Sequence, residues 1–329
     1  MSDVIGRNVA FGFQKETVRG TAIQSAVKWV GKLDFDFKPT VETITNESGF
    51  NHIAKNSRVD IIRKGGSGGL TSKIFDKQVG DLLTMAFGQV PTSVAVSGDT
   101  TVYDHTFALL NSNSHQSYTL HTVEGDIIQN SYPGAILDEI TIDIVSDDYA
   151  KIASSFMSRK AVVPSPTLVP AYTEENEFLP VHAGLKVVAK GGDLTAASVV
   201  ADVTEAHLTI SKNAFNKVSL GTDDSDPRNT VVEANLEVKL WYNGTTFRAY
   251  RDNQTKLAAR LQVINTDVTI GTTSKPTLTI DLPYIRVAEW DADYSADDLV
   301  QQTINCPVLL DLATGTFLTA KVRNLQTSY

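Results

Sequence analysis

Residues 33–38 read LDFDFK, so apolar and charged side chains alternate along this segment. A period of two is typical of a β-strand with one face against a core, because successive side chains point to opposite faces. We therefore expect Leu33, Phe35 and Phe37 to face the core, and Asp34 and Asp36 to face away from it. The same alternation recurs at residues 139–144, 232–242 and 277–282, which predicts a mainly β protein.

Two stretches of the chain repeat one pattern. Residues 25–37 and 198–210 carry apolar side chains at matching positions, and a long polar loop follows each stretch, at residues 40–57 and 213–230. Each loop leads into another strand and then into a segment with helical spacing. The apolar positions of the two predicted helices are Phe75, Val79, Leu82, Leu83 and Ala86, and then Phe247, Tyr250, Leu257, Ala258 and Leu261.

This repeat predicts two tandem copies of a small β-sandwich or barrel domain, each with one short helix. Three prolines, Pro164, Pro166 and Pro170, mark the boundary, because proline removes a ladder donor and favours an extended linker. A surface loop within one large domain is the alternative interpretation. The predicted division is an N-terminal arm at 1–24, copy 1 at 25–160, a Pro-rich linker and entry strand at 161–194, and copy 2 at 195–329.

Composition narrows the class of protein. Of 329 residues, 42% are hydrophobic and 20% are charged, which is ordinary for a globular protein with a sizeable core. The formal net charge of −9 argues against a surface that grips nucleic acid. No apolar run reaches the roughly 20 residues of a membrane helix, and the chain does not start with a secretory signal pattern. With Cys306 as the only cysteine, a reducing cytoplasm is the simplest place of synthesis.

The search for catalytic or cofactor chemistry gives no candidate. The glycine-rich run 64–73 lacks the Gly-Lys-Ser/Thr ending of a phosphate loop, so a bend or close backbone approach is the preferred interpretation. Asp291, Asp293, Ser295 and Asp297 alternate like an EF-hand loop, but that loop needs glycine and glutamate where Ala296 and Gln302 stand. We predict no enzyme activity, no metal and no cofactor.

The N-terminal sequence carries a family resemblance. Residues 6–22 read GRNVAFGFQKETVRGTA, and the LDFDF strand, the glycines at 65–69 and the segment DKQVGDLLTMAFG at 76–88 follow in that order. This order resembles the start of the tail tube proteins, the major tail proteins of long-tailed bacteriophages (siphophages). The resemblance covers about the first 90 residues and continues beyond them only as an order of elements.

The resemblance implies a structural virion protein that assembles into stacked rings, which form the hollow tail tube for DNA delivery. Two domains per chain favour a trimeric ring with pseudo-sixfold symmetry, although six chains would also satisfy the sequence. Tape-measure protein and genomic DNA would occupy the lumen without sequence-specific binding, and tail terminator and baseplate proteins would contact the tube. The protein would be made in the cytoplasm of the bacterial host, with no membrane contact.

Three sets of residues follow as candidate sites. We expect the N-terminal arm to dock on a neighbouring subunit or ring, with pairing inside its own domain as the alternative; its contacts would be Val9, Phe11, Phe13 and Gln14. We expect the two long loops to contact the adjacent ring through Glu42, Asn46, Phe50, His52, Asp223, Asp224 and Asp226. Asp34 and Asp36 would line the lumen if their strand belongs to the inner sheet, and would face solvent on an exterior sheet otherwise.

Two other functions remain open at this point. One is another ring-forming tail component, such as a terminator, a minor tail protein or a baseplate protein. The other is a carbohydrate-binding β-sandwich or a glycan-cleaving enzyme, which would need an exposed aromatic platform built from Trp29, Trp241, Trp290 or nearby tyrosines.

Overall fold

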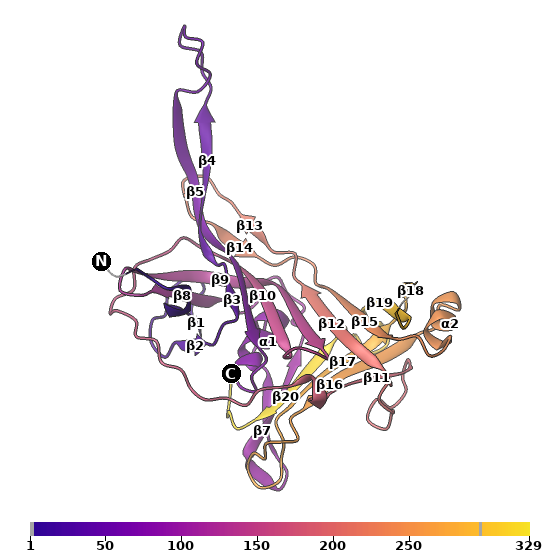
Figure 1. Ribbon diagram of the computed structural model, residues 1–329. Coiled ribbons are helices and arrows are strands. Elements are labelled where there is room, and N and C mark those ends of the chain that lie inside the picture. Colours follow the sequence, from indigo (N-terminus) through magenta and orange to yellow (C-terminus); the bar gives the residue numbers. More distant parts are fainter. Residues whose placement is uncertain (1–2, 296–297) are drawn as a thin grey trace.

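The protein, a computed structural model that describes residues 3–295 and 298–329, consists mainly of antiparallel strands (Figure 1). The first half contains η1 (Gly6–Asn8), β1 (Val9–Lys15), β2 (Lys28–Val30), β3 (Asp34–Phe35), β4 (Lys38–Asn46), β5 (Arg58–Lys73), α1 (Gln78–Phe87), β6 (Thr92–Val96), β7 (Asp99–Ala108), β8 (Tyr118–Glu124), β9 (Ile128–Val145) and β10 (Lys151–Ser158). The second half contains η2 (Pro180–His182), β11 (Ala183–Ala189), β12 (Val203–Ser211), β13 (Phe215–Lys217), β14 (Asp226–Arg228), β15 (Glu233–Trp241), α2 (Thr246–Asp252), β16 (Leu257–Ile264), β17 (Thr277–Ile285), β18 (Glu289–Asp293), β19 (Gln301–Pro307) and β20 (Thr319–Asn324).

Two sheets account for nearly all of these strands. The large sheet has 12 strands, and its main path runs β18-β19-β15-β12-β9-β10-β5-β3, with β1, β2, β4 and β8 attached beside it. The small sheet has six strands in the order β11-β16-β17-β20-β7-β6. The expected mainly β fold is confirmed.

The two halves of the chain are continuous with each other in both sheets. In the large sheet β9 pairs with β12, so that Ile142 lies opposite Leu208. In the small sheet β7 pairs with β20, so that Phe107 lies opposite Ala320. The path β12-β15-β19-β18 of the second half has the same chain order as β3-β5-β10-β9 of the first half. This order is compatible with a tandem repeat, while the domain boundaries themselves stay a prediction.

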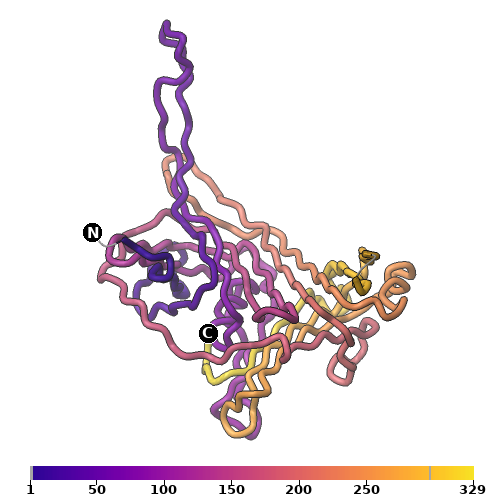
Figure 2. Tube along the Cα trace, viewed as in Figure 1, coloured from indigo at the N-terminus to yellow at the C-terminus, as the bar shows by residue number. Residues whose placement is uncertain are grey.

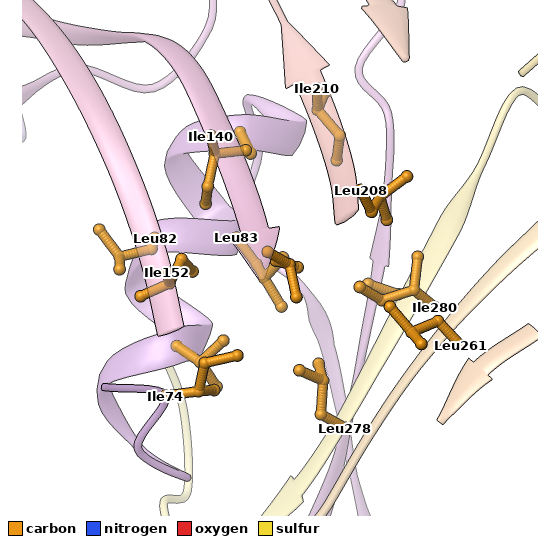
Figure 3. Packing of buried hydrophobic residues seen from close by; sticks show 14 of the residues in the cluster. Ile74, Leu82, Leu83, Ile140, Ile152, Leu208, Ile210, Leu261, Leu278 and Ile280 are labelled. Atoms are coloured by element: carbon orange, nitrogen blue, oxygen red, sulfur yellow. The ribbon is translucent and has the colours of Figure 1, made fainter. Parts of the chain in front are cut away.

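The core lies between the two sheets (Figure 3). Ile140 and Leu208 project from the large sheet, and Leu261 and Ile280 come from the small one. Every second side chain is buried along β10, β12, β15 and β19 and in residues 140–145 of β9, as an amphipathic strand requires, whereas residues 130–137 of β9 are buried on both faces. Burial of this apolar area, at about 25 cal/mol per Å², is the main force that holds the sheets together.

Helix α1 lies within this core rather than on its surface. All ten of its residues are buried, and it contacts both β9 and β7. The Glu175 carboxylate accepts the N–H groups of Lys77 (3.2 Å) and Gln78 (2.8 Å), so a residue of the Pro-rich segment caps the helix start. Gly88, with a φ of 83°, ends the helix in the left-handed conformation that favours glycine. The first predicted helix is confirmed at Val79, Leu82, Leu83 and Ala86, whereas Phe75 lies before the helix and forms an isolated bridge with Glu177.

The second predicted helix is only partly correct. Helix α2 covers Thr246–Asp252, whereas Leu257, Ala258 and Leu261 belong to strand β16. Gln254, with a φ of 51°, breaks the helical path between them. Leu257, Leu261 and Val263 are buried at the spacing of a strand. The apolar pattern that predicted one helix therefore combined a short helix with the start of a strand.

The first long loop is a hairpin. Strand β4 pairs with β5 from Lys38 opposite Ser67 to Asn46 opposite Arg58, which leaves only residues 47–57 as a turn. This β4–β5 hairpin extends well beyond the body of the molecule (Figure 2). The expectation of an irregular loop at residues 40–57 was therefore wrong, because the exposed strands lack the one-sided apolar pattern that marks a core strand.

The N-terminal segment also differs from the expected arm. Strand β1 pairs with β2 and β8 of its own chain, and Phe11 and Phe13 are buried in its own core. Val9 and Gln14 are paired in the same strand. The assignment of these four residues as contacts to a neighbouring subunit is corrected: the partner of this aromatic strand is β8, about one hundred residues further along.

Candidate assembly interface

One face of the large sheet is turned away from the small sheet, and we call it the outer face. Strand registers place Thr71, Ala153, Thr141 and Thr209 in one row across four strands, on the side opposite the buried residues. Asp34 extends this row, because it lies opposite Thr71. The expectation that Asp34 faces away from the core agrees with its exposure, and Asp36 is exposed as well. Phe35 and Phe37 pack in the core, but Leu33 is half exposed, contrary to expectation.

The outer face is rich in acidic side chains. The acids that alternate with the core residues are Asp34, Asp36, Glu139, Asp143, Glu205, Glu233, Glu237, Glu289, Asp291 and Asp293. The lysines in the same positions are Lys73, Lys151 and Lys239. Acids outnumber bases on this broad surface, so it repels polyanions at neutral pH.

The two halves meet on this face through complementary side chains. His207 of β12 contacts Asp143 of β9 (2.7 Å) and Glu205 (3.1 Å) through its two ring nitrogens. Lys239 contacts Glu205 at 2.7 Å. The hydrogen bonds that His207 donates to the carboxylates of Asp143 and, second, Glu205 raise the pKa of His207 to about 9, so the imidazole is charged at neutral pH. Sequence reasoning missed this pair because strand register decides it.

The β4–β5 hairpin presents apolar side chains to solvent. Phe50 is 65% exposed and Ile53 is fully exposed at the turn, while Val41 and Ile44 are about half exposed along β4. Of the expected contact residues, Glu42 pairs with Arg63 at 2.6 Å, and Asn46 and His52 hold the local turn. A cluster of exposed apolar groups on a projecting element is typical of an interaction surface.

The acids of the second long loop have partners within the chain. Asp224 pairs with Arg159 (2.7 Å), and Asp223 pairs with Lys160 (2.6 Å). Asp226 pairs with Arg228 at 2.9 Å and lies 3.7 Å from Arg19. These ion pairs tie the segment around strands β13 and β14 to the first half of the chain, while the expected role of the three acids in contacts between rings stays a prediction.

A buried carboxylate fixes the chain after β1. Glu16 is 4% exposed, and its oxygens accept the Oγ proton of Ser117 (2.7 Å) and the Oγ1 proton of Thr119 (2.9 Å). They also accept the N–H groups of Gly20 and Gly134, both at 2.7 Å. Glu16 is part of the family motif in the sequence, but it was not predicted to have a role. Its position in a polar turn that ends at a glycine was the one indication in the sequence that it fixes the chain.

A buried lysine connects the second half to α1. The Lys212 ammonium is fully buried and donates to the carbonyl of Met85 at 2.7 Å. Burial, with a smaller contribution from the charge of Arg19, lowers the pKa of Lys212 to about 7. Nothing in the local sequence marks this side chain as buried, because strand β12 ends one residue earlier.

The glycine-rich run and the tryptophans have structural roles. In the glycine run, Gly68 has a φ of 142°, and an added Cβ would lie 2.4 Å from Cα of Phe37, so the close-approach interpretation is confirmed. Trp29 packs in a small cluster, Trp241 is 38% exposed, and Arg248 and Arg251 flank the Trp290 ring, so the three tryptophans form no shared platform.

The described residues contain neither a metal-binding cluster nor a membrane-spanning helix. Within residues 3–295 and 298–329, no group of His, Cys, Asp and Glu side chains is placed to hold a metal ion. Asp297 of the EF-hand-like series lies outside the described residues. In the same part of the chain, no helix has the length and apolar character needed to cross a membrane.

The fold and these surfaces define a structural β-sandwich protein with open strand edges and a projecting hairpin. A family model described as phage tail tube protein matches residues 6–308. The chain belongs to this family, so it is a structural tail tube protein of the virion tail, and the family assignment suggested by the N-terminal motif is confirmed. No curated protein matches the chain.

Proposed function

We propose that three copies of this chain close into a pseudo-sixfold ring, and that such rings stack into the tail tube. The observation that carries the proposal is the eight-strand path of the large sheet, which ends in two open edges, β18 and β3. Strands β9 and β12 already join the two halves, and an equivalent contact between β18 and β3 of the next copy would continue the sheet. A closed ring leaves no edge exposed.

The diameter expected for a closed ring favours three chains per ring over six. Three copies of the eight-strand path, at about 4.8 Å between strands and a tilt of about 40°, close into a cylinder with a backbone diameter of about 48 Å. After side chains, that cylinder still admits a DNA double helix. Six copies would give a cylinder of about twice that diameter, far wider than the DNA requires.

The outer face would then line the lumen. Its acidic character suits a conduit, because basic walls would bind the phosphate backbone and hold the DNA. The β4–β5 hairpin would contact the adjacent ring through Phe50 and Ile53. In this arrangement the protein performs no catalysis; its partners are its own copies, tape-measure protein and DNA in the lumen, and terminator and baseplate proteins at the tube ends. Synthesis would take place in the host cytoplasm.

Negative-stain electron microscopy of the purified protein tests the proposal. We expect long hollow tubes whose end views show six lobes, with three chains per ring by mass. Single rings that never stack would favour a terminator-like component, and a persistent monomer that binds sugars would contradict the assignment.

Two variants test the surfaces. A protein that lacks residues 42–56 should fold but fail to stack, and native tubes from it would exclude the hairpin as the contact between rings. Replacement of both Asp34 and Asp36 by lysine should keep the fold but slow DNA ejection. Unchanged infectivity of such virions would contradict a lumenal outer face.

A further inference from the structure

The two open edges of the large sheet are capped by their own side chains. On β3, the Asp34 carboxylate accepts the N–H of Phe35 at 2.8 Å. On β18, the Asp291 carboxylate accepts the N–H of Ala292 at 2.9 Å, and Arg251 donates to the carbonyl of Trp290 at 3.2 Å. In the described chain β3 pairs only with β5, and β18 only with β19. Side chains thus bind backbone groups that a further strand would otherwise use.

The seam between β9 and β12 provides a template for the contact between copies. Leu208 of β12 lies opposite Leu236 of β15, as Phe35 of β3 lies opposite Leu70 of β5. In a superposition of these two strand pairs, Phe35 of β3 is therefore the residue that corresponds to Leu208 of β12. The paired residues can be followed one strand further, through β10 in the first half and through β19 in the second half. In this comparison Trp290 of β18 corresponds to Ile142 of β9.

The residues of the outer face follow from this comparison. Asp34 takes the place of His207, and Asp291 takes the place of Asp143, the acid that contacts His207 across the β9–β12 seam. Asp36 and Glu289 take the places of Thr209 and Thr141, which lie opposite each other with their hydroxyl oxygens 3.2 Å apart.

We propose that β18 of one copy pairs antiparallel with β3 of the next copy in this register, so that Asp291 faces Asp34 and Glu289 faces Asp36. The inference rests on the proposed ring and adds its register and its charge. The β9–β12 seam within the chain is held by a charge-complementary pair, whereas the seam between copies sets acids against acids. Like charges directly opposite each other weaken strand pairing.

Acidic residues of β18 face acidic residues of β3 in more than one possible register of the two strands. The core side chains fix which residues of each strand face outward, so only shifts of two residues are allowed. The outward residues of β18 are Glu289, Asp291 and Asp293, and every one is acidic. A shift of two in one direction therefore places Asp291 opposite Asp36 and Asp293 opposite Asp34, and a shift of two in the other direction places Glu289 opposite Asp34.

This seam makes ring closure sensitive to salt. At about 0.1 M salt the screening length is about 10 Å, longer than the distance between facing side chains, and at about 1 M it falls to about 3 Å. Subunits at low salt therefore repel each other at the edges that must meet, and each edge keeps its side-chain caps. Screening removes the repulsion and favours closure.

A disulfide test checks the register. The double variant Asp34→Cys with Asp291→Cys should form disulfides only between copies, because β3 and β18 lie at opposite ends of the sheet. Facing residues of antiparallel strands have Cα atoms about 4.5–5.5 Å apart, within disulfide range. Assembled rings should give covalent trimers on a non-reducing gel. The control, Asp34→Cys with Glu289→Cys, should give little cross-linking; efficient cross-linking of the control alone would overturn the register.

A salt series checks the charge. Asp34→Asn with Asp36→Asn should lower the critical concentration for assembly about tenfold at low salt, and the difference from wild type should vanish at about 1 M NaCl. The matched control is Glu139→Gln with Glu237→Gln, which removes two acids from the outer face away from the open edges. It should stay within about twofold of wild type.

The outcomes separate the inference from the proposed function. Rings that form with equal salt dependence in the wild type, the edge variant and the control would overturn the opposed acids while leaving the ring intact. Absence of rings at every salt concentration would overturn the proposed function itself, and the inference with it.

Discussion

Glu16 gives the sharpest test of how the N-terminal segment is held. Glu16→Ala removes an acceptor from four donors: the hydroxyls of Ser117 and Thr119 and the backbone N–H groups of Gly20 and Gly134. The hydroxyls can rotate towards other acceptors, whereas the two N–H groups are fixed. A buried unpaired donor costs about 1–3 kcal/mol, so we expect the free energy of unfolding to fall by about 2–6 kcal/mol.

Urea denaturation followed by tryptophan fluorescence measures this loss. Glu16→Gln, which keeps one side-chain acceptor, should lose roughly half as much. The control is Glu47→Ala in the hairpin turn, where the exposed pair with Lys55 at 3.1 Å should contribute less than about 1 kcal/mol. If Glu16→Ala lost no more than this control, the carboxylate would not hold β1 to β8, and the account of the N-terminus would be wrong.

Three further substitutions test buried or strained positions. Because the pKa of Lys212 is lowered to about 7, the unfolded chain binds more protons than the folded chain between pH 7 and pH 10.5. In urea titrations, the stability of wild type relative to Lys212→Met should therefore rise with pH across this window. His207 has its pKa raised to about 9, so its stabilisation is complete below pH 6.5 and lost as pH rises through 9; His207→Gln should be less stable than wild type at pH 6 and equal to it at pH 10. Gly68→Ala should lower the unfolding free energy by more than about 2 kcal/mol, because the added Cβ meets the Phe37 backbone; a wild-type melting temperature would refute this.

The strands that carry core side chains were predictable from the sequence. Residues 139–144, 232–242 and 277–282 alternate because one face of each is buried, and all three fall in strands β9, β15 and β17. The hairpin strand β4 escaped prediction because neither of its faces is against a core. The prediction that the second helix continues to Leu261 was wrong, because the spacing of Leu257 and Leu261 fits a strand as well as a helix.

The candidate interface was predictable only in part. Asp34 was assigned to the correct face from alternation alone, whereas the pairing of His207 with Asp143 depends on a strand register that no local pattern encodes. Phe11 and Phe13 were assigned to a neighbour because the partner strand β8 lies far along the chain. Long-range pairing of this kind is set by the whole core, not by the segment itself.

The double connection between the halves has a mechanical consequence. Because β9–β12 joins them in one sheet and β7–β20 joins them in the other, a hinge between the halves would have to break hydrogen bonds in both layers at once. Each chain therefore behaves as a stiff plate under bending. A tail built from such plates would flex where rings meet, and the slender β4–β5 hairpin would carry the strain when the tail bends.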